Sequence, residues 1–141
     1  FKSAQGYSMN IYVADLNYEK LNFELFFPTN NFTNDYNIHT AGRITEFKNN
    51  KLILSIGAPK ATRENAQNIK SFEGKIISIN LNDKKTQIIS MGHRNAQGLF
   101  YEDTLDLVIN TEHGPKGGDE INFNRVNENQ NIPNFGWPIS S

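Results

Sequence analysis

The feature that most constrains the fold is an internal repeat of β-type segments. Two pairs of β-type runs begin at Gly42 and Gly98, and each pair ends in a loop of glycine, proline and lysine, "GAPK" and "GPKG". Each pair is followed by a run of the form Gly-x-x-Ile-x-apolar-Asn, which begins at Gly74 and at Gly118. A repeat of about 40–57 residues with four strands per unit is typical of a β-propeller blade.

Short β-type runs separated by turn residues extend over most of the chain, and they predict an all-β fold. The nine runs lie at residues 10–16, 21–27, 42–47, 51–57, 74–81, 85–90, 97–102, 105–111 and 119–126. Only residues 61–72 have helical composition, and they fall in a connection. The pair Asn49–Asn50 suits the positive-φ turn of a tight hairpin. An antiparallel sandwich with coincidental internal similarity is the alternative to propeller blades.

The repeat predicts how the chain is divided into blades of four antiparallel strands. Residues 1–38 hold the end of one blade, residues 39–91 a full blade, and residues 92–141 most of the next. Propellers close with four or more blades. We therefore expect the chain to be a partial β-propeller domain, either a piece of a longer protein or a chain that self-associates through its open blade edges.

Composition excludes several classes of protein. The chain of 141 residues has 14 Lys and Arg against 15 Asp and Glu, and the two signs are interspersed. No basic stripe is present, so we expect neither nucleic-acid binding nor an acidic-membrane surface. There is no cysteine, which rules out disulfides and thiolate metal sites. The longest apolar run is too short to span a bilayer, and the three histidines lack zinc-ligand spacing.

Four segments occur in an order that resembles one known family. They are "HTAGRI" at 39–44, "GHRNAQGL" at 92–99, "TEHGPKGGDEIN" at 111–122 and "NFGWP" at 134–138. Together they resemble the soluble quinoprotein glucose/sorbosone dehydrogenase family. The resemblance implies a six-bladed propeller that holds pyrroloquinoline quinone (PQQ) on a calcium ion. It also implies oxidation of an aldose sugar at the anomeric carbon, with hydride passed to the quinone, in a periplasmic or secreted protein.

The resemblance also implies the catalytic and cofactor-binding residues. His39 would be the general base for the anomeric hydroxyl, a task that suits an imidazole titrating near neutrality. Arg94 would stabilise negative charge on the cofactor as hydride arrives, and Asp119 would lie near the substrate. Arg94 would bind the cofactor together with Asn95 and His113.

The metal ligands that the resemblance implies are mainly backbone groups. Calcium takes oxygen ligands, and the carbonyls of Gly114 and Pro115 would hold it. Glycine allows the unusual backbone of such a loop, and proline stiffens it. Glu120 would serve a second calcium found in some members. Because consecutive strand residues point to opposite faces, we expect Asp119 and Glu120 to face opposite ways. We expect Trp137 to pack as an apolar anchor between blades.

The sequence leaves the activity of this chain open. It stops before the family's remaining cofactor contacts, so we expect the parent protein, rather than this chain alone, to be the dehydrogenase. A non-catalytic propeller module that binds a protein or glycan is the alternative, since propellers host many functions. A calcium-dependent lactonase-type propeller is a third possibility. The combination of His39, Arg94 and Gly114–Pro115 favours the dehydrogenase.

Overall fold

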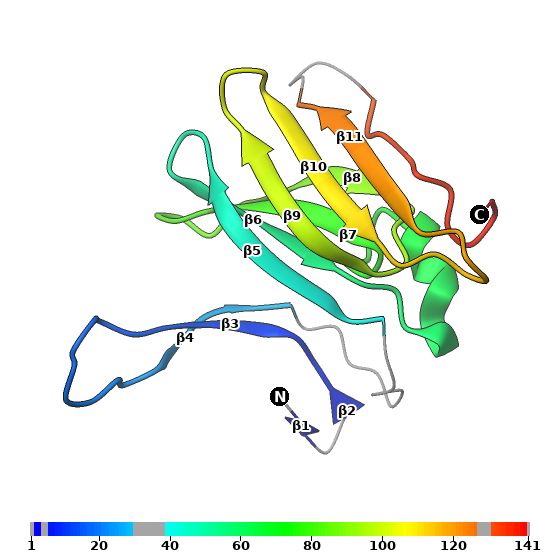
Figure 1. Ribbon diagram of the computed structural model, residues 1–141. Coiled ribbons are helices and arrows are strands. Elements are labelled where there is room, and N and C mark those ends of the chain that lie inside the picture. The colour runs from blue at the N-terminus through cyan, green and yellow to red at the C-terminus, as the bar shows by residue number, and fades with distance from the viewer. Residues whose placement is uncertain (1, 4–5, 30–38, 127–130, 141) are drawn as a thin grey trace.

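The computed structural model describes residues 2–3, 6–29, 39–126 and 131–140. The chain folds into antiparallel sheets joined by turns and one short 3-10 helix, η1 (Figure 1). The elements are β1 (Lys2–Ser3), β2 (Gly6–Tyr7), β3 (Asn10–Val13), β4 (Glu24–Pro28), β5 (Ala41–Phe47), β6 (Lys51–Ile56), η1 (Lys60–Gln67), β7 (Lys75–Asn80), β8 (Thr86–Met91), β9 (Ala96–Glu102), β10 (Leu107–Glu112) and β11 (Glu120–Arg125). The predicted all-β class is confirmed.

The strands of the described residues form four sheets, of which one has the four antiparallel strands of a propeller blade. These sheets are β1–β2, β3–β4, β5–β6–β7–β8 and β9–β10–β11. Strands that follow one another in the chain are neighbours in each sheet. The predicted blade limits at residues 38 and 91 stay a prediction, and residue 38 lies outside the described residues. The four-stranded sheet itself runs from Ala41 to Met91.

Each of the nine predicted runs contains a strand, and their ends differ by a few residues. The first run ends early at Val13 and the second begins late at Glu24, because only those residues pair with each other. The strands β1 and β2 were not predicted, since two residues are too short to show a period. The Asn49–Asn50 turn is confirmed, with φ of 58° and 57°. The predicted helix is shorter than expected and ends at Gln67.

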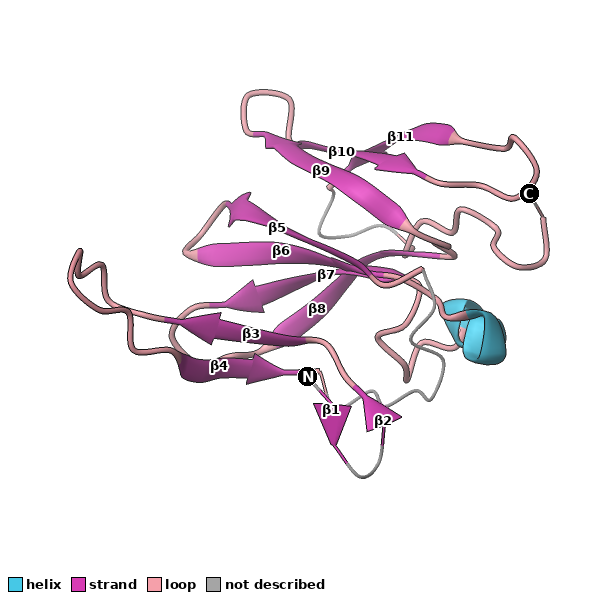
Figure 2. Cartoon of the chain, turned by 60° about the horizontal axis from the view of Figure 1, so that its bottom comes forward, coloured by secondary structure: helices cyan, strands magenta, loops and turns pink. Residues whose placement is uncertain are grey.

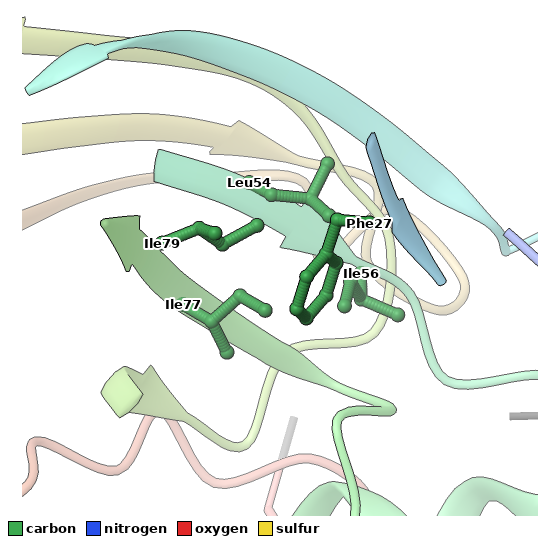
Figure 3. Close-up of a cluster of buried hydrophobic side chains, with 5 residues drawn as sticks. All are labelled: Phe27, Leu54, Ile56, Ile77 and Ile79. Carbon is green, nitrogen blue, oxygen red and sulfur yellow. The ribbon is translucent and has the colours of Figure 1, made fainter. Parts of the chain in front are cut away.

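The four-stranded sheet is covered on both faces, so the sheets stack in layers (Figure 2). On one face, Phe27 of β4 packs against Leu54 and Ile56 of β6 and Ile77 and Ile79 of β7 (Figure 3). This cluster excludes water from the space between β3–β4 and the four-stranded sheet. Each fully buried side chain of this size contributes about 1.5–3 kcal/mol relative to the exposed state.

On the other face, the four-stranded sheet packs against the sheet β9–β10–β11. Ile53, Ile76 and Ile89 meet Val108 of β10 and Phe47 in a second buried cluster. Alternate residues of β6 and β7 thus face two different cores. This explains why both strands are nearly continuous apolar runs instead of alternating ones. The stacking of antiparallel sheets face to face is the arrangement of neighbouring propeller blades.

A buried lysine ties η1 to the sheet. Lys75 Nζ donates hydrogen bonds to the carbonyl oxygens of Asn65 at 2.8 Å, Ala66 at 2.9 Å and Glu73 at 2.9 Å. Burial lowers the pKa of Lys75 to about 8, so the ammonium group is charged at neutral pH and can donate all three bonds. No helix within the described ranges is long and apolar enough to cross a membrane.

Candidate functional site

Backbone hydrogen bonds gather three loops at one end of the two larger sheets. The amide of Gly57 donates to the carbonyl of Thr40 at 3.1 Å, and the amide of Ala58 donates to the carbonyl of Arg94 at 2.9 Å. The amide of His113 donates to the carbonyl of Asn95 at 3.2 Å. The loops that carry His39, Arg94 and His113 are therefore fixed to one another through their main chains.

Gly57 is the point where the loop of His39 packs closely. A Cβ atom at position 57 would lie 1.9 Å from the carbonyl oxygen of His39, so only glycine fits there. His39 is buried, with 9% of its surface exposed, and has a φ of 71°. Positive φ is uncommon for residues with side chains, and histidine is among the types that adopt it most readily. The structure thus holds the predicted general base in a constrained, closely packed segment.

The side chain of Arg94 spans the gap to the glycine-proline loop. Its Nη1 donates to the carbonyl of His113 at 2.7 Å and to the carbonyl of Gly114 at 3.2 Å. Its guanidinium carbon lies 5.3 Å from the centre of the Trp137 ring. The Nε of Arg94 is buried and has no hydrogen-bond acceptor among the described residues. The structure therefore brings Arg94, His113 and Gly114 together.

A buried carboxylate holds the backbone of the Arg94–Asn95 pair. Glu112 Oε1 accepts hydrogen bonds from the amide of Arg94 and, at 3.1 Å, from the amide of Asn95. Glu112 Oε2 lies 2.8 Å from His93 Nδ1, and His93 Nε2 lies 2.7 Å from Ser90 Oγ. The carboxylate is 7% exposed, and the His93 and Ser90 side chains are fully buried.

Two opposing effects set the pKa of Glu112. Burial alone raises the pKa of this carboxyl, because it penalises the charged form. Hydrogen bonds and charge from His93 and the amides of Arg94 and Asn95 outweigh burial and lower the pKa below 4.5. Glu112 is therefore ionised at neutral pH, and its charge points at the loop of Arg94.

The glycine-proline loop is closed by its own residues. The amide of Gly114 donates to Asp119 Oδ1 at 3.1 Å, and the amide of Gly118 donates to the carbonyl of Pro115 at 3.0 Å. A Cβ atom at position 114 would lie 1.7 Å from the carbonyl oxygen of Gly118, so this position needs glycine. His113 Nδ1 lies 3.6 Å from Asp119 Oδ2, and both side chains are exposed. Asp119 thus braces the loop that carries the predicted calcium ligands.

The direction in which Asp119 and Glu120 face stays a prediction. Both line the same open pocket of about 250 Å³, together with Glu112 and His113. The strand β11 begins only at Glu120, so Asp119 lies in the loop, where strand alternation does not apply. Glu120 also accepts a hydrogen bond from the Asn122 amide at 3.2 Å.

Asn95 and Trp137 both link parts of this end of the molecule. Asn95 is buried, and its Oδ1 accepts a hydrogen bond from the amide of Ala41 at 3.0 Å, which joins the start of β5 to the loop before β9. The amide of Trp137 donates to the carbonyl of Gly92 at 3.0 Å. Trp137 Nε1 is buried and lacks an acceptor in the part of the chain that the structure describes. Trp137 therefore presents a polar edge as well as the apolar ring that the sequence predicts.

Glu112, His93 and Ser90 have no role predicted from the sequence motifs. The sequence does contain a signal for Glu112. Along β10 it lies two residues after Asn110 and four after Val108. Strand residues two apart share a face, and Val108 marks this one as the buried face. A charged residue at an inward position needs a partner, so Glu112 could have been recognised as the centre of a buried network.

The oxygen atoms of the glycine-proline loop fit a calcium ion in their chemistry. Among the described residues, no three His, Asp or Glu side chains are grouped to hold a metal. The carbonyls of Gly114 and Pro115 are a different kind of donor, and each keeps a second lone pair beside its present hydrogen bond. With the carboxylates of Asp119 and Glu120 on the same loop and strand start, the donor set is all oxygen, as calcium prefers.

Two buried N–H donors near the glycine-proline loop would suit a ligand that supplies acceptor atoms. The Arg94 Nε and Trp137 Nε1 groups are both N–H donors without acceptors in the described ranges. Both residues line one hollow of about 10 Å³, which Glu112 and Glu120 line as well. A buried donor without an acceptor is costly, so this corner favours a ligand that supplies oxygen atoms.

Comparison with known proteins shows the family to which the chain is similar. The sequence profile of the family described as Glucose / Sorbosone dehydrogenase matches residues 2–141. The chain is 36% identical to a protein of Synechocystis, over 73% of this chain and 29% of that protein. It is 28% identical to the aldose sugar dehydrogenase of Escherichia coli, over 73% of this chain and 30% of that enzyme.

Solved structures show the same similarity. The PQQ-bound form of the aldose sugar dehydrogenase of Streptomyces coelicolor superposes with a TM-score of 0.75 and 25% sequence identity. The match covers 100% of this chain and 43% of that one. The chain thus spans less than a third of the two curated relatives and less than half of this solved relative.

Proposed function

The chain belongs to the glucose/sorbosone dehydrogenase family, and from this premise we propose that it forms part of a PQQ- and calcium-dependent sugar dehydrogenase. Its substrate is an aldose, which is oxidised at the anomeric carbon and leaves as a lactone. We place the protein in the periplasm or outside the cell. Because the chain spans only part of its relatives, the activity is proposed for the protein that carries it.

One observation carries the proposal. The guanidinium of Arg94 donates hydrogen bonds to the carbonyls of His113 and Gly114, and its Nε has no acceptor among the described residues. A fixed cation with a free donor beside carbonyl oxygens suits an anionic cofactor that is bound on a metal ion. Guanidinium groups recognise such planar anions better than ammonium groups do.

We assign the cofactor and metal contacts as follows. Arg94, Asn95 and His113 contact PQQ, and the carbonyls of Gly114 and Pro115 hold calcium. Glu120, at the start of β11, is assigned to a second calcium. When bound, PQQ supplies the oxidant and takes up the hydride, that is, two electrons and the hydrogen of the anomeric carbon.

Two side chains of this chain act on the sugar. His39 takes the proton of the anomeric hydroxyl as the C–O bond becomes a carbonyl, so the charge of the substrate does not change as hydride leaves. Asp119 orients the sugar from the pocket that it lines with His113. Arg94 stabilises the negative charge that arises beside it, as preorganised donors do in other active sites.

The test is a titration of the protein with PQQ and calcium, followed through the absorbance of the quinone. Dye reduction is then measured with a panel of aldoses. We expect PQQ binding that requires calcium, and turnover that depends on the aldose. A protein that binds neither PQQ nor calcium would contradict the proposal and favour a non-catalytic propeller module.

A further inference from the structure

A line of three buried side chains runs from β8 to β10 beneath the loop of Arg94. Ser90 Oγ lies 2.7 Å from His93 Nε2, and His93 Nδ1 lies 2.8 Å from Glu112 Oε2. Serine, histidine and an acid in this order resemble the triad of a hydrolase. Here Ser90 and His93 are fully buried, so no substrate reaches the serine hydroxyl. The line must therefore act on the protein itself.

The imidazole of His93 cannot turn away from its two partners. Its ring stacks on the ring of Phe135, with centroids 4.9 Å apart and an angle of 29° between the planes. The segment of Phe135 is itself fixed, since its amide donates to the carbonyl of Met91 at 2.9 Å. Each ring nitrogen of His93 thus has one defined neighbour, which fixes where Glu112 can lie.

Glu112 in turn holds the backbone of the loop that carries Arg94. Its Oε1 accepts the amide hydrogens of Arg94 and Asn95, two consecutive backbone donors. The side-chain amide nitrogens of Asn110 and Asn122 lie farther from Oε2, at 3.4 and 3.5 Å. A buried carboxylate binds backbone N–H groups about twice as strongly as a neutral acceptor does. The Cα of Arg94, from which the guanidinium reaches the glycine-proline loop, is therefore anchored by charge.

We propose that Ser90, His93 and Glu112 form a positioning network that sets the place of the Arg94 guanidinium. Glu112 is the positioning residue in contact with Arg94, and His93 and Ser90 hold the Glu112 carboxylate in place. Arg94 is the residue that contacts the cofactor, and the network acts only through it. The catalytic consequence rests on the proposed function, whereas the effect on Arg94 itself does not.

The substitution Glu112→Gln separates charge from shape. Glutamine fills nearly the same volume. It replaces one of the two acceptor oxygens of glutamate by an NH₂ group, which donates. If the new amide faces His93, the ring must change tautomer, so that Nδ1 accepts and Nε2 donates to Ser90. If it faces the other way, it opposes the amides of Arg94 and Asn95. Either orientation weakens the anchor of Arg94.

The first measurement is hydrogen exchange in the intact protein, with Glu46→Gln as the matched control. Glu46 is exposed on β5, outside the network. We expect Glu112→Gln to speed exchange of the Arg94 and Asn95 amides by about tenfold or more, the factor for a charge-assisted hydrogen bond. The amide of Ile77, in the four-stranded sheet, is the internal reference. Unchanged exchange at Arg94 and Asn95 would overturn the proposal whether or not the protein oxidises sugars.

The second measurement uses the nitrogen NMR signals of His93. We expect a hydrogen on Nδ1 in the wild-type protein and a shift of these signals in Glu112→Gln. If that variant does not fold, Ser90→Ala is used, because it removes only the outer partner of His93. It should move the same signals and speed exchange at Arg94 by a smaller factor. Identical His93 signals in the wild-type protein and Ser90→Ala would overturn the network.

The third measurement links the network to catalysis. We expect Glu112→Gln to lower kcat with PQQ by about tenfold or more while the KM for the aldose changes little, since Arg94 contacts the cofactor and not the sugar. Unchanged kcat together with faster exchange at Arg94 would overturn the catalytic consequence. If the wild-type protein has no PQQ-dependent turnover, the proposed function fails by itself, and hydrogen exchange still decides the positioning role.

Discussion

The guanidinium of Arg94 donates a hydrogen bond of 2.7 Å to the carbonyl oxygen of His113, and so joins two loops on different strand ends. The same nitrogen reaches the carbonyl of Gly114 at 3.2 Å. This second contact puts a permanent positive charge beside the carbonyl of Gly114, one of the two proposed calcium ligands. The predictions about the site follow from this placement.

Replacing Arg94 by lysine should lower kcat/KM for dye-linked aldose oxidation by about 100-fold, the usual loss for one preorganised donor. Lysine keeps the charge, but it cannot donate in a planar fork to the loop carbonyls and to a ligand at once. Steady-state kinetics at saturating PQQ and calcium measure this loss. Arg125→Lys, on the exposed face of β11, is the control and should behave as the wild type. Wild-type turnover in Arg94→Lys would remove Arg94 from the site.

Replacing His39 by asparagine should lower kcat by about 100-fold or more, because general-base catalysis is lost. Asparagine is the suitable substitute, since it tolerates the φ of 71° that this position requires. The thermal unfolding midpoint should therefore stay close to that of the wild type. Stopped-flow measurement of cofactor reduction isolates the chemical step. A variant that reduces the cofactor at the wild-type rate would show that His39 is not the base.

Replacing Gly114 by alanine should destabilise the protein by about 1–3 kcal/mol, the usual cost of overpacking. The new Cβ would lie 1.7 Å from the carbonyl oxygen of Gly118, and that backbone must move. Calcium binding, followed by calorimetry, should weaken as well. Gly118→Ala is the matched control, because its Cβ would meet nothing closer than the Pro115 oxygen at 3.2 Å. Equal effects in the two variants would argue against a special geometry at Gly114.

Tyr101 should make the stability fall in the alkaline range. Burial, together with a hydrogen bond of 2.7 Å to Asp106, raises the pKa of Tyr101 from 10.0 to about 12. The folded protein therefore keeps this proton longer than the unfolded chain, and stability falls as pH rises from 10 through 12. Urea unfolding at pH 9 and pH 11 should show a smaller loss in Tyr101→Phe than in the wild type. Tyr18→Phe, at a 95% exposed position, should keep the wild-type loss. Parallel pH curves for Tyr101→Phe and the wild type would contradict this.

Replacing Lys75 by methionine should destabilise the fold by about 1–3 kcal/mol, because the buried carbonyl of Glu73 loses its donor, while the carbonyls of Asn65 and Ala66 keep the amides of Asn68 and Gly92. Methionine keeps most of the volume, so the loss reports the hydrogen bonds to Asn65, Ala66 and Glu73. Lys85→Met, whose side chain is 84% exposed, is the control and should change stability little. Denaturant unfolding measures both. A Lys75→Met variant as stable as the wild type would show that η1 does not depend on this lysine.

Local patterns account for most of the fold. The apolar runs at 51–57 and 74–81 predict central strands because both faces of β6 and β7 are buried. The Asn49–Asn50 turn followed from residue type alone, since few residues adopt positive φ at low cost. Strand ends were less certain, because pairing between β3 and β4 depends on contacts that a single run does not contain.

What the sequence by itself determined was the all-β class, most of the strands, and the motifs that contain the proposed site residues, including Arg94 and Gly114. Only the tertiary structure decided that Glu112, His93 and Ser90 form one buried line, and that Asp119 and Glu120 border one pocket. The physical reason is the distance along the chain between the residues that interact. Turn and strand preferences arise from a residue and its near neighbours, whereas a buried hydrogen-bond network depends on where distant strands place their side chains.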